Sequence, residues 1–556
     1  MILETDLLVL GGGGTGARAA LAAAEEGLAV TLVSKNPPGR SGSTALAFET
    51  MQAALGPGDS PELHCHDTFT CGRSLSYPHL ARALAGDAPG RVKDLADLGV
   101  DFKRDLYGRI TLIHEPGQTV SRSCFINGGG SQLMKVLVRA LSRAGVEVLP
   151  DVACLEVVLW DGSVAGAVLL DLASGNVLPV KAGAVILATG GYGQLWSMTD
   201  TAVDTTGDGV ALAYRAGATL TDLEMVLFYP TAVVHPHSCK GMLIPYEVFL
   251  DPAGLAGRLL NSDGTPLDTS PLPTRDTLVS MMMAQFHQEK ATPNGGLWLD
   301  LASSPLTHGR KQELMAQHLP RAYIRHLGAL GVDILESPVE VSPMVHYSLG
   351  GVLIDENGLT TVPGLFAAGE VAGNVHGANR LSGNALTETQ VFGYRAGKAA
   401  SSYLKPLRAA TGEDMVVRAA RGWRERTLGL LAPKSGQLRP HEIKAALKAE
   451  AWKHLGLERN DGGMRAFLDF LEDASGNLGL MGVLEGLDTP YPYPLLEALE
   501  VSMMLETSRL VALSAIAREE TRGHHFRSDY PDALEEPSHT QVSPQGEGSV
   551  IRRAVL

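Results

Sequence analysis

The residues that most clearly predict chemistry lie in one glycine-rich turn near the start of the chain. Three of its glycines have the spacing GxGxxG, which is typical of a turn that binds the diphosphate of a dinucleotide. The first lets the chain turn sharply, the second lets backbone approach the diphosphate, and the third lets a helix pack closely on a strand. The predicted contact residues are Gly11, Gly12, Gly13, Gly14, Thr15 and Gly16.

Such a turn must follow a strand and open a helix, because the helix N-terminus supplies N–H donors and a positive dipole to the anion. Residues 6–10 are an apolar run that predicts the strand, and the alanine-rich residues 17–26 predict the helix, with Gly27 as its stop. Residues 28–33 predict a second strand. The alternative is an incidental glycine-rich turn.

The second predicted strand ends in Ser34 and Lys35. In NAD-binding proteins an acidic residue usually stands there and holds a ribose hydroxyl. A serine hydroxyl can still bond the ribose, so the pair argues against a simple NAD site.

Composition limits the class of protein. The 556 residues suggest about three domains, and the 45% of apolar residues allow a large core. The net charge of −15 repels phosphate backbones and anionic lipids, so we expect no nucleic-acid partner and no direct membrane insertion. The apolar runs are interrupted well short of a membrane span. The first six residues lack the basic start of a signal peptide, which favours a cytoplasmic location.

The five cysteines are 65, 71, 124, 154 and 239, and no two have CxxC spacing. An iron–sulfur cluster needs about four positioned thiolates, so we predict no cluster and no metal site in this chain. A sparse, odd set of cysteines also argues against disulfides and fits a reducing cytosol.

Further along, residues 152–172 predict a β-hairpin that turns at Asp161 and Gly162. Residues 184–188 predict a buried strand. The composition changes between 235 and 344, where prolines gather and an inserted domain is expected.

From about residue 405 the pattern is helical. A long helix is predicted over residues 495–522, with Gly523 as its end. Residues 533–550 are polar and predict loop or extended structure.

Several longer motifs follow one another in an order that specifies a family. The strongest are GLFAAGE at 364–370 and HGANRLSGNAL at 376–386. The others are SK at 34–35, RS at 40–41, ATGG at 188–191, TGDG at 206–209, RD at 275–276, WLD at 298–300, PMVHYSLGG at 343–351 and REETRGH at 518–524. On these motifs the chain resembles the flavoprotein subunit of the fumarate reductase and succinate dehydrogenase family, whose relatives include L-aspartate oxidase.

The resemblance implies an α/β fold with three parts. These are an FAD-binding Rossmann-like domain, an inserted α+β capping domain and a C-terminal helical domain. The implied boundaries are 1–234 with 345–404 for FAD binding, 235–344 for the capping (substrate) domain, 405–532 for the helical domain and 533–556 for a polar tail.

The resemblance also implies FAD as the cofactor and gives roles to single residues. Ala153 would meet the adenine through backbone groups, and Ala385 and Leu386 would offer N–H groups to the flavin ring. Asp208 and Glu370 would help hold the cofactor, although each could instead cap a helix or satisfy a turn. The other implied cofactor residues are Ser34, Lys35, Arg40, Ser41, Gly42, Ser43, Thr189, Gly190 and Arg380.

One departure concerns the attachment of the cofactor. Family members that bind FAD covalently use a histidine after Arg-Ser. Here Gly42 and Ser43 follow Arg40 and Ser41, so we expect non-covalent FAD.

Arg275 occupies the place of the family's catalytic arginine, the general acid of fumarate reduction. His346 and Arg380 match the pair that clamps one substrate carboxylate, and a guanidinium suits bidentate binding of a carboxylate. The plainer alternatives are an ion pair between Arg275 and Asp276, and a buried His346 bonded to backbone.

The other end of the expected pocket departs from the family. Tyr229 replaces a histidine that helps to bind a second carboxylate. Tyr246 replaces the glutamate of a Thr-Glu motif that is followed shortly by arginine, and Phe249 stands at the arginine's place. Glu247, displaced by one position, could still reach the site. Losing two donors would weaken binding of a second carboxylate by about 3–6 kcal/mol.

We therefore expect a substrate with one clamped carboxylate and a neutral or aromatic remainder, with Tyr229 and Tyr246 as binding residues. The alternative is that these aromatic side chains belong to the core of the capping domain.

The implied activity is an FAD-dependent transfer of hydride between flavin and a C=C or CH–CH bond of an organic acid. The altered Thr-Glu-Arg segment disfavours amine oxidation like that of L-aspartate oxidase. The retained Arg275, His346 and Arg380 disfavour a non-catalytic flavin electron relay. Because the chain is expected to hold one redox centre, we expect an iron–sulfur electron-transfer partner, as in respiratory members of the family.

Overall fold

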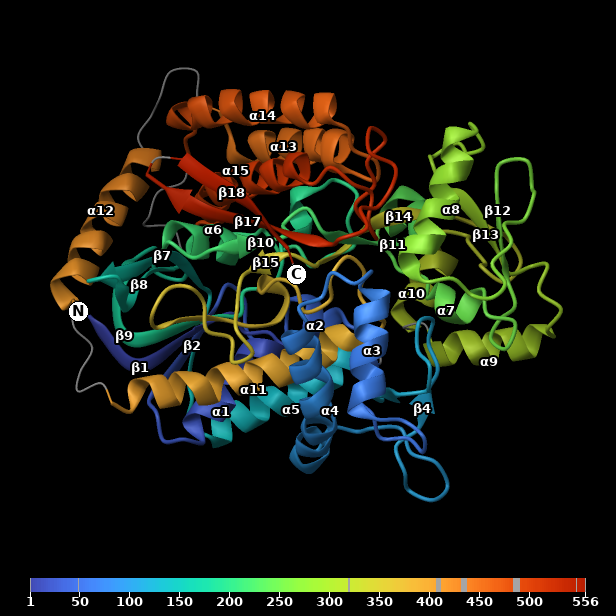
Figure 1. Cartoon of the computed structure of the whole chain (residues 1–556), viewed down its shortest axis with the longest axis horizontal. Helices are drawn as coiled ribbons and strands as arrows, with labels where there is room; N and C mark the ends of the chain where they lie inside the picture. The colour runs from blue at the N-terminus through green and yellow to red at the C-terminus, as the bar shows by residue number, and fades with distance from the viewer. Residues whose placement is uncertain are drawn as a thin grey trace.

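The computed structural model describes residues 2–48, 50–318, 321–406, 412–431, 438–483, 491–546 and 548–555. Figure 1 shows a central sheet with helices below it, a second sheet at the right, and a layer of C-terminal helices above. Among the described residues, no helix has the length and apolar character to cross a membrane.

The central sheet has seven strands in the order β6-β2-β1-β9-β8-β7, with β16 beside one end of β9. The pairs of β1 with β2, β1 with β9 and β2 with β6 are parallel, whereas β7, β8 and β9 form an antiparallel meander. The predicted first strands and the hairpin at 161–162 are confirmed. The strands are β1 (Leu3–Leu10), β2 (Val30–Ser34), β6 (Glu147–Pro150), β7 (Val152–Trp160), β8 (Ser163–Asp171), β9 (Val177–Leu187) and β16 (Leu365–Ala367).

Helices α1 (Gly14–Ala24), α5 (Gly129–Arg143) and α11 (Asn384–Leu404) lie together along one face of this sheet (Figure 1). Glycine allows α11 to approach α1 closely, because a Cβ at Gly397 would lie 2.3 Å from the Ala19 carbonyl oxygen. The first helix starts and ends slightly earlier than predicted, at residues 14 and 24 rather than 17 and 26.

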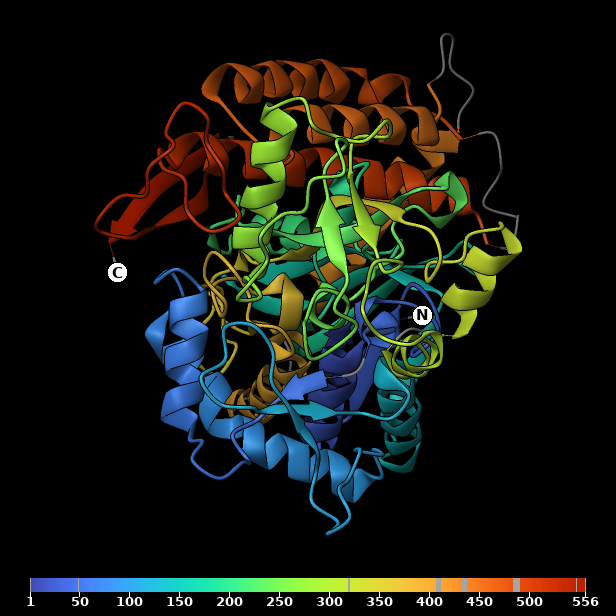
Figure 2. The same cartoon turned by 90° about the vertical axis from the view of Figure 1, so that its right-hand side faces the viewer.

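The second sheet has four antiparallel strands in the order β11-β14-β13-β12 and a hydrophobic core of its own. It faces the viewer in Figure 2. β11 and β14 extend across the predicted boundaries at 234/235 and 344/345. The elements are β11 (Val226–His235), α7 (Tyr246–Phe249), β12 (Arg258–Leu260), α8 (Arg275–His287), β13 (Leu297–Asp300), α9 (His308–His318), α10 (Arg321–Ala329) and β14 (Val339–Ser348).

The C-terminal helices are α12 (Glu413–Leu431), α13 (Pro440–Leu455), α14 (Asp461–Gly476) and α15 (Tyr493–Ala517). The predicted long helix is present, but it ends at Ala517 and not at residue 522. The backbone of Arg518 is extended, because its guanidinium turns into a buried cluster of carboxylates.

The polar tail predicted as loop or extended structure is a β-hairpin of β17 (Ser538–Gln545) and β18 (Gly548–Val555). β17 pairs with β10 (Leu220–Thr221), which pairs with β15 (Gly351–Val352). The hairpin thus completes a four-stranded sheet beside the C-terminal helices (Figure 1).

The remaining elements are α2 (Ser43–Leu46), β3 (Thr50–Gln52), α3 (Pro61–Cys71), α4 (Pro78–Leu98), β4 (Leu112–Ile113), β5 (Ser123–Phe125) and α6 (Asp208–Arg215). Of these, α2, β3, β4 and α6 contribute residues to the cavity described below.

Candidate active site

A cavity of about 380 Å³ is lined by residues of both the central sheet and the second sheet (β11-β14-β13-β12), which we call the capping sheet. We call the region around the glycine turn its cofactor part and the region around Arg275 its substrate part. The predicted residues that line the cavity are Gly11, Gly12, Gly13, Gly14, Thr15, Ser34, Lys35, Ser41, Gly42, Ser43, Thr189, Gly190, Asp208, Tyr229, Arg275, His346, Glu370, Arg380, Ala385 and Leu386.

In the cofactor part, the glycine turn joins β1 to α1 as the motif requires. Gly11 has a φ of +118°, and a Cβ at Gly16 would lie 1.9 Å from the Gly11 carbonyl oxygen, so Gly16 serves helix–strand packing and does not line the cavity. The N-cap of α1 is Gly13, which provides no side-chain cap. The Gly14 N–H donates to the Thr44 hydroxyl at 3.2 Å, so the N–H groups that follow it in the first turn of α1 are the ones that could meet an anion in the cavity.

A second helix N-terminus meets the same cavity. The N-cap of α11 is Gly383, again without a side-chain cap, and Ala385 and Leu386 in its first turn line the cavity. The Thr189 hydroxyl is buried there and has no hydrogen-bond partner among the described residues. Two uncapped helix starts and an unpartnered buried hydroxyl are what a diphosphate and a polar ring system need, so these residues fit a flavin dinucleotide.

Lys35 is held between two carboxylates, with its Nζ 2.5 Å from Asp208 and 2.6 Å from Glu500. Burial opposes the charge on Lys35, but the two carboxylates outweigh burial and raise its pKa. Asp208 opens α6 and Glu500 lies on α15. The ammonium group thus ties the end of β2 to the C-terminal helices beside the cavity.

Glu370 is buried at the cavity wall, and its Oε1 accepts a hydrogen bond of 3.0 Å from the Ser348 N–H. Burial raises the pKa of Glu370 to about 7. The carboxyl group can therefore act as donor or acceptor toward a cofactor hydroxyl near neutral pH.

Three other predicted contacts lie off the cavity wall. The Ala153 side chain points away from the cavity that its neighbours Val152 and Cys154 line, because successive side chains of a strand point to opposite faces. Its predicted contact with adenine uses backbone groups and stays a prediction. The Arg40 side chain is exposed and does not line the cavity. Tyr246 is buried in the capping core, with its Oη donating to the Pro273 carbonyl at 3.0 Å.

In the substrate part, Arg275 begins α8 and points its guanidinium at the cavity. Nη2 lies 3.0 Å from Glu247 Oε1 and 2.9 Å from Ser382 Oγ. The guanidinium also lies 4.9 Å from the centre of the Tyr229 ring, and the Tyr229 hydroxyl donates to Glu247 Oε2 at 2.6 Å. The displaced Glu247 therefore does reach the site and binds both residues.

Arg380 and His346 lie together in the same part of the cavity, with the His346 ring centre 5.1 Å from that of Tyr229. His346 Nδ1 is 3.0 Å from Asp200 Oδ1, and His346 Nε2 is 3.4 Å from Arg380 Nη2. Burial lowers the pKa of His346, and burial lowers that of Arg380 to about 10. Arg275 Nη1 and Arg380 Nε are both buried, and neither has a partner in the part of the chain that the structure describes. Two guanidinium groups with free donors form a site for an anion.

Sequence reasoning missed Glu115 and Asp200, which both line the cavity. Glu115 Oε1 accepts from the Thr50 hydroxyl at 3.0 Å, and its Oε2 is buried without a partner. Burial, and then the nearby Glu247, raises the pKa of Glu115. No local motif marks either acid, because only the fold brings them to Arg275 and His346.

Among the described residues, no group of three His, Cys, Asp or Glu side chains is placed to hold a metal ion. The fold and the cavity define a class: a dinucleotide-binding oxidoreductase whose reaction site lies beneath a second, capping sheet.

The family description "FAD binding domain" matches residues 6–386, and "Fumarate reductase flavoprotein C-term" matches residues 444–547. A subunit of the fumarate reductase (CoM/CoB) of Methanothermobacter marburgensis is 35% identical, over 96% of each chain. The L-aspartate oxidase of Caulobacter vibrioides is 32% identical, over 94% of this chain and 93% of that one. A chain of the Mycobacterium smegmatis Sdh1 complex in the apo form has a TM-score of 0.88 at 31% identity, covering 100% of this chain and 94% of that chain.

The chain therefore belongs to the fumarate reductase and succinate dehydrogenase flavoprotein family of FAD-dependent oxidoreductases.

Proposed function

We propose that the protein transfers hydride between FAD and a C=C or CH–CH bond of an organic acid. The observation that carries this proposal is the placement of Arg275 and Arg380, two buried guanidinium groups with unpartnered donors, on one cavity with the cofactor residues. Bound FAD would supply or accept the hydride at one carbon. The side chains of the substrate part would then bind the acid and move the proton.

Arg275 is the proposed proton donor to the second carbon, so that C=C becomes CH–CH. Burial disfavours its charge, but Glu247 outweighs burial and raises the pKa of Arg275. An arginine that gives up a proton must be refilled, and Glu247 at 3.0 Å can do so. The Tyr229 hydroxyl, 2.6 Å from Glu247, extends this route by one group.

Arg380 and His346 are the proposed clamp for one carboxylate of the substrate. The remainder of the substrate would face Tyr229, Glu247 and Glu115. Two carboxylate side chains there disfavour a second carboxylate on the substrate, because like charges repel strongly in a buried site. We therefore propose an acid with one clamped carboxylate and a neutral, aromatic or hydrogen-bond-donating remainder.

Steady-state reduction with an artificial one-electron donor, such as reduced viologen, tests this proposal. The panel should include fumarate, a short monocarboxylic enoate and an aromatic enoate. We expect the highest kcat/KM for a monocarboxylic enoate. Fast turnover of fumarate at low KM, with none of the monocarboxylic acids, would overturn the substrate class but leave the reaction type intact.

A second candidate function is amine oxidation, which one specific observation favours. Glu115 lines the same cavity as the carboxylate clamp, and its Oε2 has no partner among the described residues, so this carboxylate could bind a substrate ammonium group. Incubation with L-aspartate and oxygen tests this candidate through release of ammonia and hydrogen peroxide. If wild type releases ammonia and Glu115→Gln does not, amine oxidation replaces enoate reduction as the proposed activity; no ammonia from wild type excludes it.

We further propose that an iron–sulfur subunit exchanges electrons with the flavin. One relative is named as a subunit, and one solved neighbour is part of a complex, whereas this chain has no predicted cluster ligands of its own. All five cysteines are free thiols, which supports a reducing compartment such as the cytosol. Co-purification from the native source, followed by iron and flavin analysis, tests the partner: flavin without iron would contradict it.

A further inference from the structure

The loop after α15 places one buried histidine between three segments that line the cavity. The side chain of His524 is fully buried. Its Nδ1 accepts a hydrogen bond of 3.4 Å from the Phe228 N–H, and its Nε2 lies 3.1 Å from Asn379 Oδ1. Because the backbone N–H can only donate, Nδ1 must be the acceptor and Nε2 must carry the hydrogen that is donated to Asn379.

The chain of hydrogen bonds continues toward the substrate part. Asn379 Nδ2 donates to Asp276 Oδ1 at 2.9 Å, and Arg73 Nε donates to Asp276 Oδ2 at 2.6 Å. Asn379 and Asp276 are both buried. Each of these hydrogen bonds has only one possible donor: His524 donates to Asn379, and Asn379 donates to Asp276, which also accepts from Arg73. The four side chains therefore form one connected and oriented network.

Three residues bonded in this network are direct chain neighbours of residues that line the substrate part. Phe228 precedes Tyr229, Asn379 precedes Arg380 and Asp276 follows Arg275. None of the three partners lines the cavity itself. One side chain from the C-terminal region thus bonds the backbone beside Tyr229 and, through the Asn379 and Asp276 side chains, connects to the residues beside Arg380 and Arg275.

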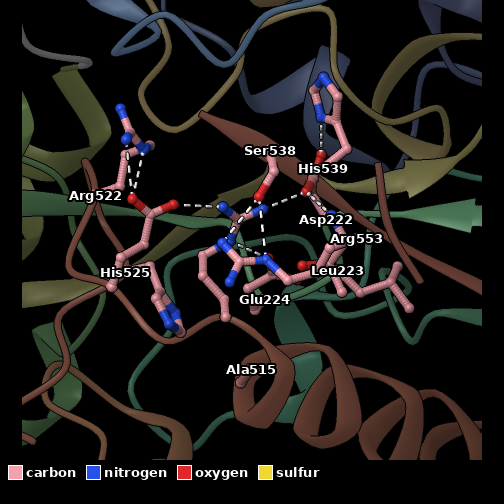
Figure 3. Close-up of polar contacts among 12 residues, drawn as sticks. Asp222, Leu223, Glu224, Ala515, Arg522, His525, Ser538, His539 and Arg553 are labelled. Carbon is pink, nitrogen blue, oxygen red and sulfur yellow. Dashed lines mark hydrogen bonds and ion pairs between the residues drawn. The ribbon is translucent and has the colours of Figure 1, made fainter. Parts of the chain in front are cut away.

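The loop that presents His524 is itself anchored by a buried ionic cluster. The Arg518 guanidinium lies 2.5 Å from Asp222, 2.5 Å from Glu224 and 2.7 Å from Glu520. Figure 3 shows Asp222 also bonded to His539 of β17, and Arg522 paired with a carboxylate of the same loop. A Cβ at Gly523 would lie 2.2 Å from the Ala378 carbonyl oxygen, so this loop is pressed against the segment that carries Arg380.

We propose that His524 is a positioning residue for the reaction: through Asn379 and Asp276 it sets the relative placement of Arg380 and Arg275. The role is one of a neutral hydrogen-bonding group, which agrees with burial lowering the pKa of His524 to about 3. This inference rests on the roles given to Arg275 and Arg380 above. It assigns no contact with substrate to His524.

Two amide substitutions separate the two bonds of the ring. In His524→Gln, the amide nitrogen takes the place of Nε2 and keeps the bond to Asn379. In His524→Asn, the amide oxygen takes the place of Nδ1 and keeps only the bond to Phe228. We expect kcat of H524Q within about threefold of wild type and kcat of H524N lower by roughly 10- to 100-fold, since a shift of about 1 Å in catalytic groups costs on that order. The FAD content of both variants should equal that of wild type.

His525→Asn is the matched control. His525 is also fully buried, but its Nδ1 bonds Arg459 at 2.8 Å, and it makes no bond to any partner of His524. A purely structural role would lower kcat of H524N and H525N in proportion to their loss of thermal stability. Equal kcat per folded chain in H524N and H525N would overturn the proposal.

Asn379→Ala removes the amide that joins His524 to Asp276. This variant tests the proposal if H524N does not fold. We expect N379A to lose as much kcat as H524N, and the double variant to lose no more, because both break one network. If the loss of kcat in the double variant is instead the product of the two single losses, the positioning role is overturned. Activity that survives in Arg275→Ala would instead refute the proposed function. Failure of the positioning role and failure of the proposed function therefore show in different variants.

Discussion

Around the glycine turn the cavity wall presents mainly backbone groups, whereas around Arg275 it presents charged side chains. The cofactor part uses the uncapped starts of α1 and α11, which lie within two continuous stretches of sequence. The substrate part brings Glu115, Asp200, Glu247, Arg275, His346 and Arg380 together from six separate segments.

This difference determines how each part responds to change. A site made of backbone N–H groups tolerates many side chains, provided that the glycines leave room for the ligand. A site made of charged side chains changes its preferred ligand with single substitutions, because each charge-assisted bond contributes about 1.5–3 kcal/mol. The family can therefore keep its cofactor and vary its substrate.

The largest effect is expected in the substrate part, from Arg275→Ala. Loss of a positioned proton donor lowers kcat by roughly 10²–10⁴-fold, whereas the cofactor contacts are untouched. Turnover and flavin absorbance per chain measure the two quantities. Arg310→Ala is the control, because Arg310 is an exposed arginine of the same capping region, paired with Glu313. An R275A variant with kcat within about tenfold of wild type contradicts the proton-donor role.

The cofactor part is tested by Gly13→Ala. A Cβ at Gly13 would lie 3.7 Å from the Thr44 hydroxyl oxygen, the nearest atom of the described residues, so the variant should fold. The methyl group would instead occupy the approach of the diphosphate, and losing about one charge-assisted bond raises the Kd for FAD by roughly 10- to 100-fold. Titration of apoprotein with FAD measures this. Gly86→Ala in α4, with nothing within 4 Å of its Cβ, should bind FAD like wild type; an unchanged Kd in G13A would show that this wall does not meet the cofactor.

A smaller, pH-dependent effect is expected at the carboxylate clamp. Burial lowers the pKa of His346, so near neutral pH its Nδ1–H donates to Asp200 and its Nε2 accepts from Arg380. A bound carboxylate needs a donor at Nε2, so binding takes up a proton. The protonated form increases as pH falls, and KM should therefore fall toward low pH, by at most about tenfold per unit. KM measured from about pH 6 to 8 checks this. In His346→Gln, KM should depend little on pH. A wild-type KM that rises toward low pH would contradict the uptake of a proton by His346.

The last prediction is that no flavin is covalently bound to the protein. Gly42 has a φ of +84° and stands where covalent members carry histidine, and a side chain there would strain the backbone. Acid precipitation should leave all flavin in the supernatant. A yellow pellet would refute non-covalent binding.

The same contrast explains what can be predicted from the sequence. The βαβ unit, the hairpin at 161–162 and the helix starts depend on local patterns, and the structure confirms them closely. Family position assigns backbone groups of Ala153 to the adenine; its chain neighbours Val152 and Cys154 line the cavity, and the backbone contact stays a prediction. The predicted end of α15 is wrong, because the charge cluster that draws Arg518 out of the helix comes from distant segments.

In the substrate part, the resemblance points to Arg275, His346 and Arg380, which all line the cavity. Glu247, one position from the family's glutamate, contacts Arg275 as the sequence allowed. Tyr246 follows its plainer alternative and lies in the capping core. Glu115 could not be predicted, because its relevance arises only from proximity to Arg275 and Glu247 in the folded chain. Local patterns carry no information on contacts between such distant positions.

The position of His524 so late in the chain also has a consequence for synthesis. The cofactor residues are complete at Leu386, and His524 follows 138 residues later (524 − 386). At about 5–20 residues per second, a growing chain carries all its proposed flavin contacts for roughly 7–28 s before the histidine that aligns Arg275 with Arg380 exists. A nascent chain in that interval has the residues to hold a redox cofactor but lacks one that the proposed reaction geometry requires.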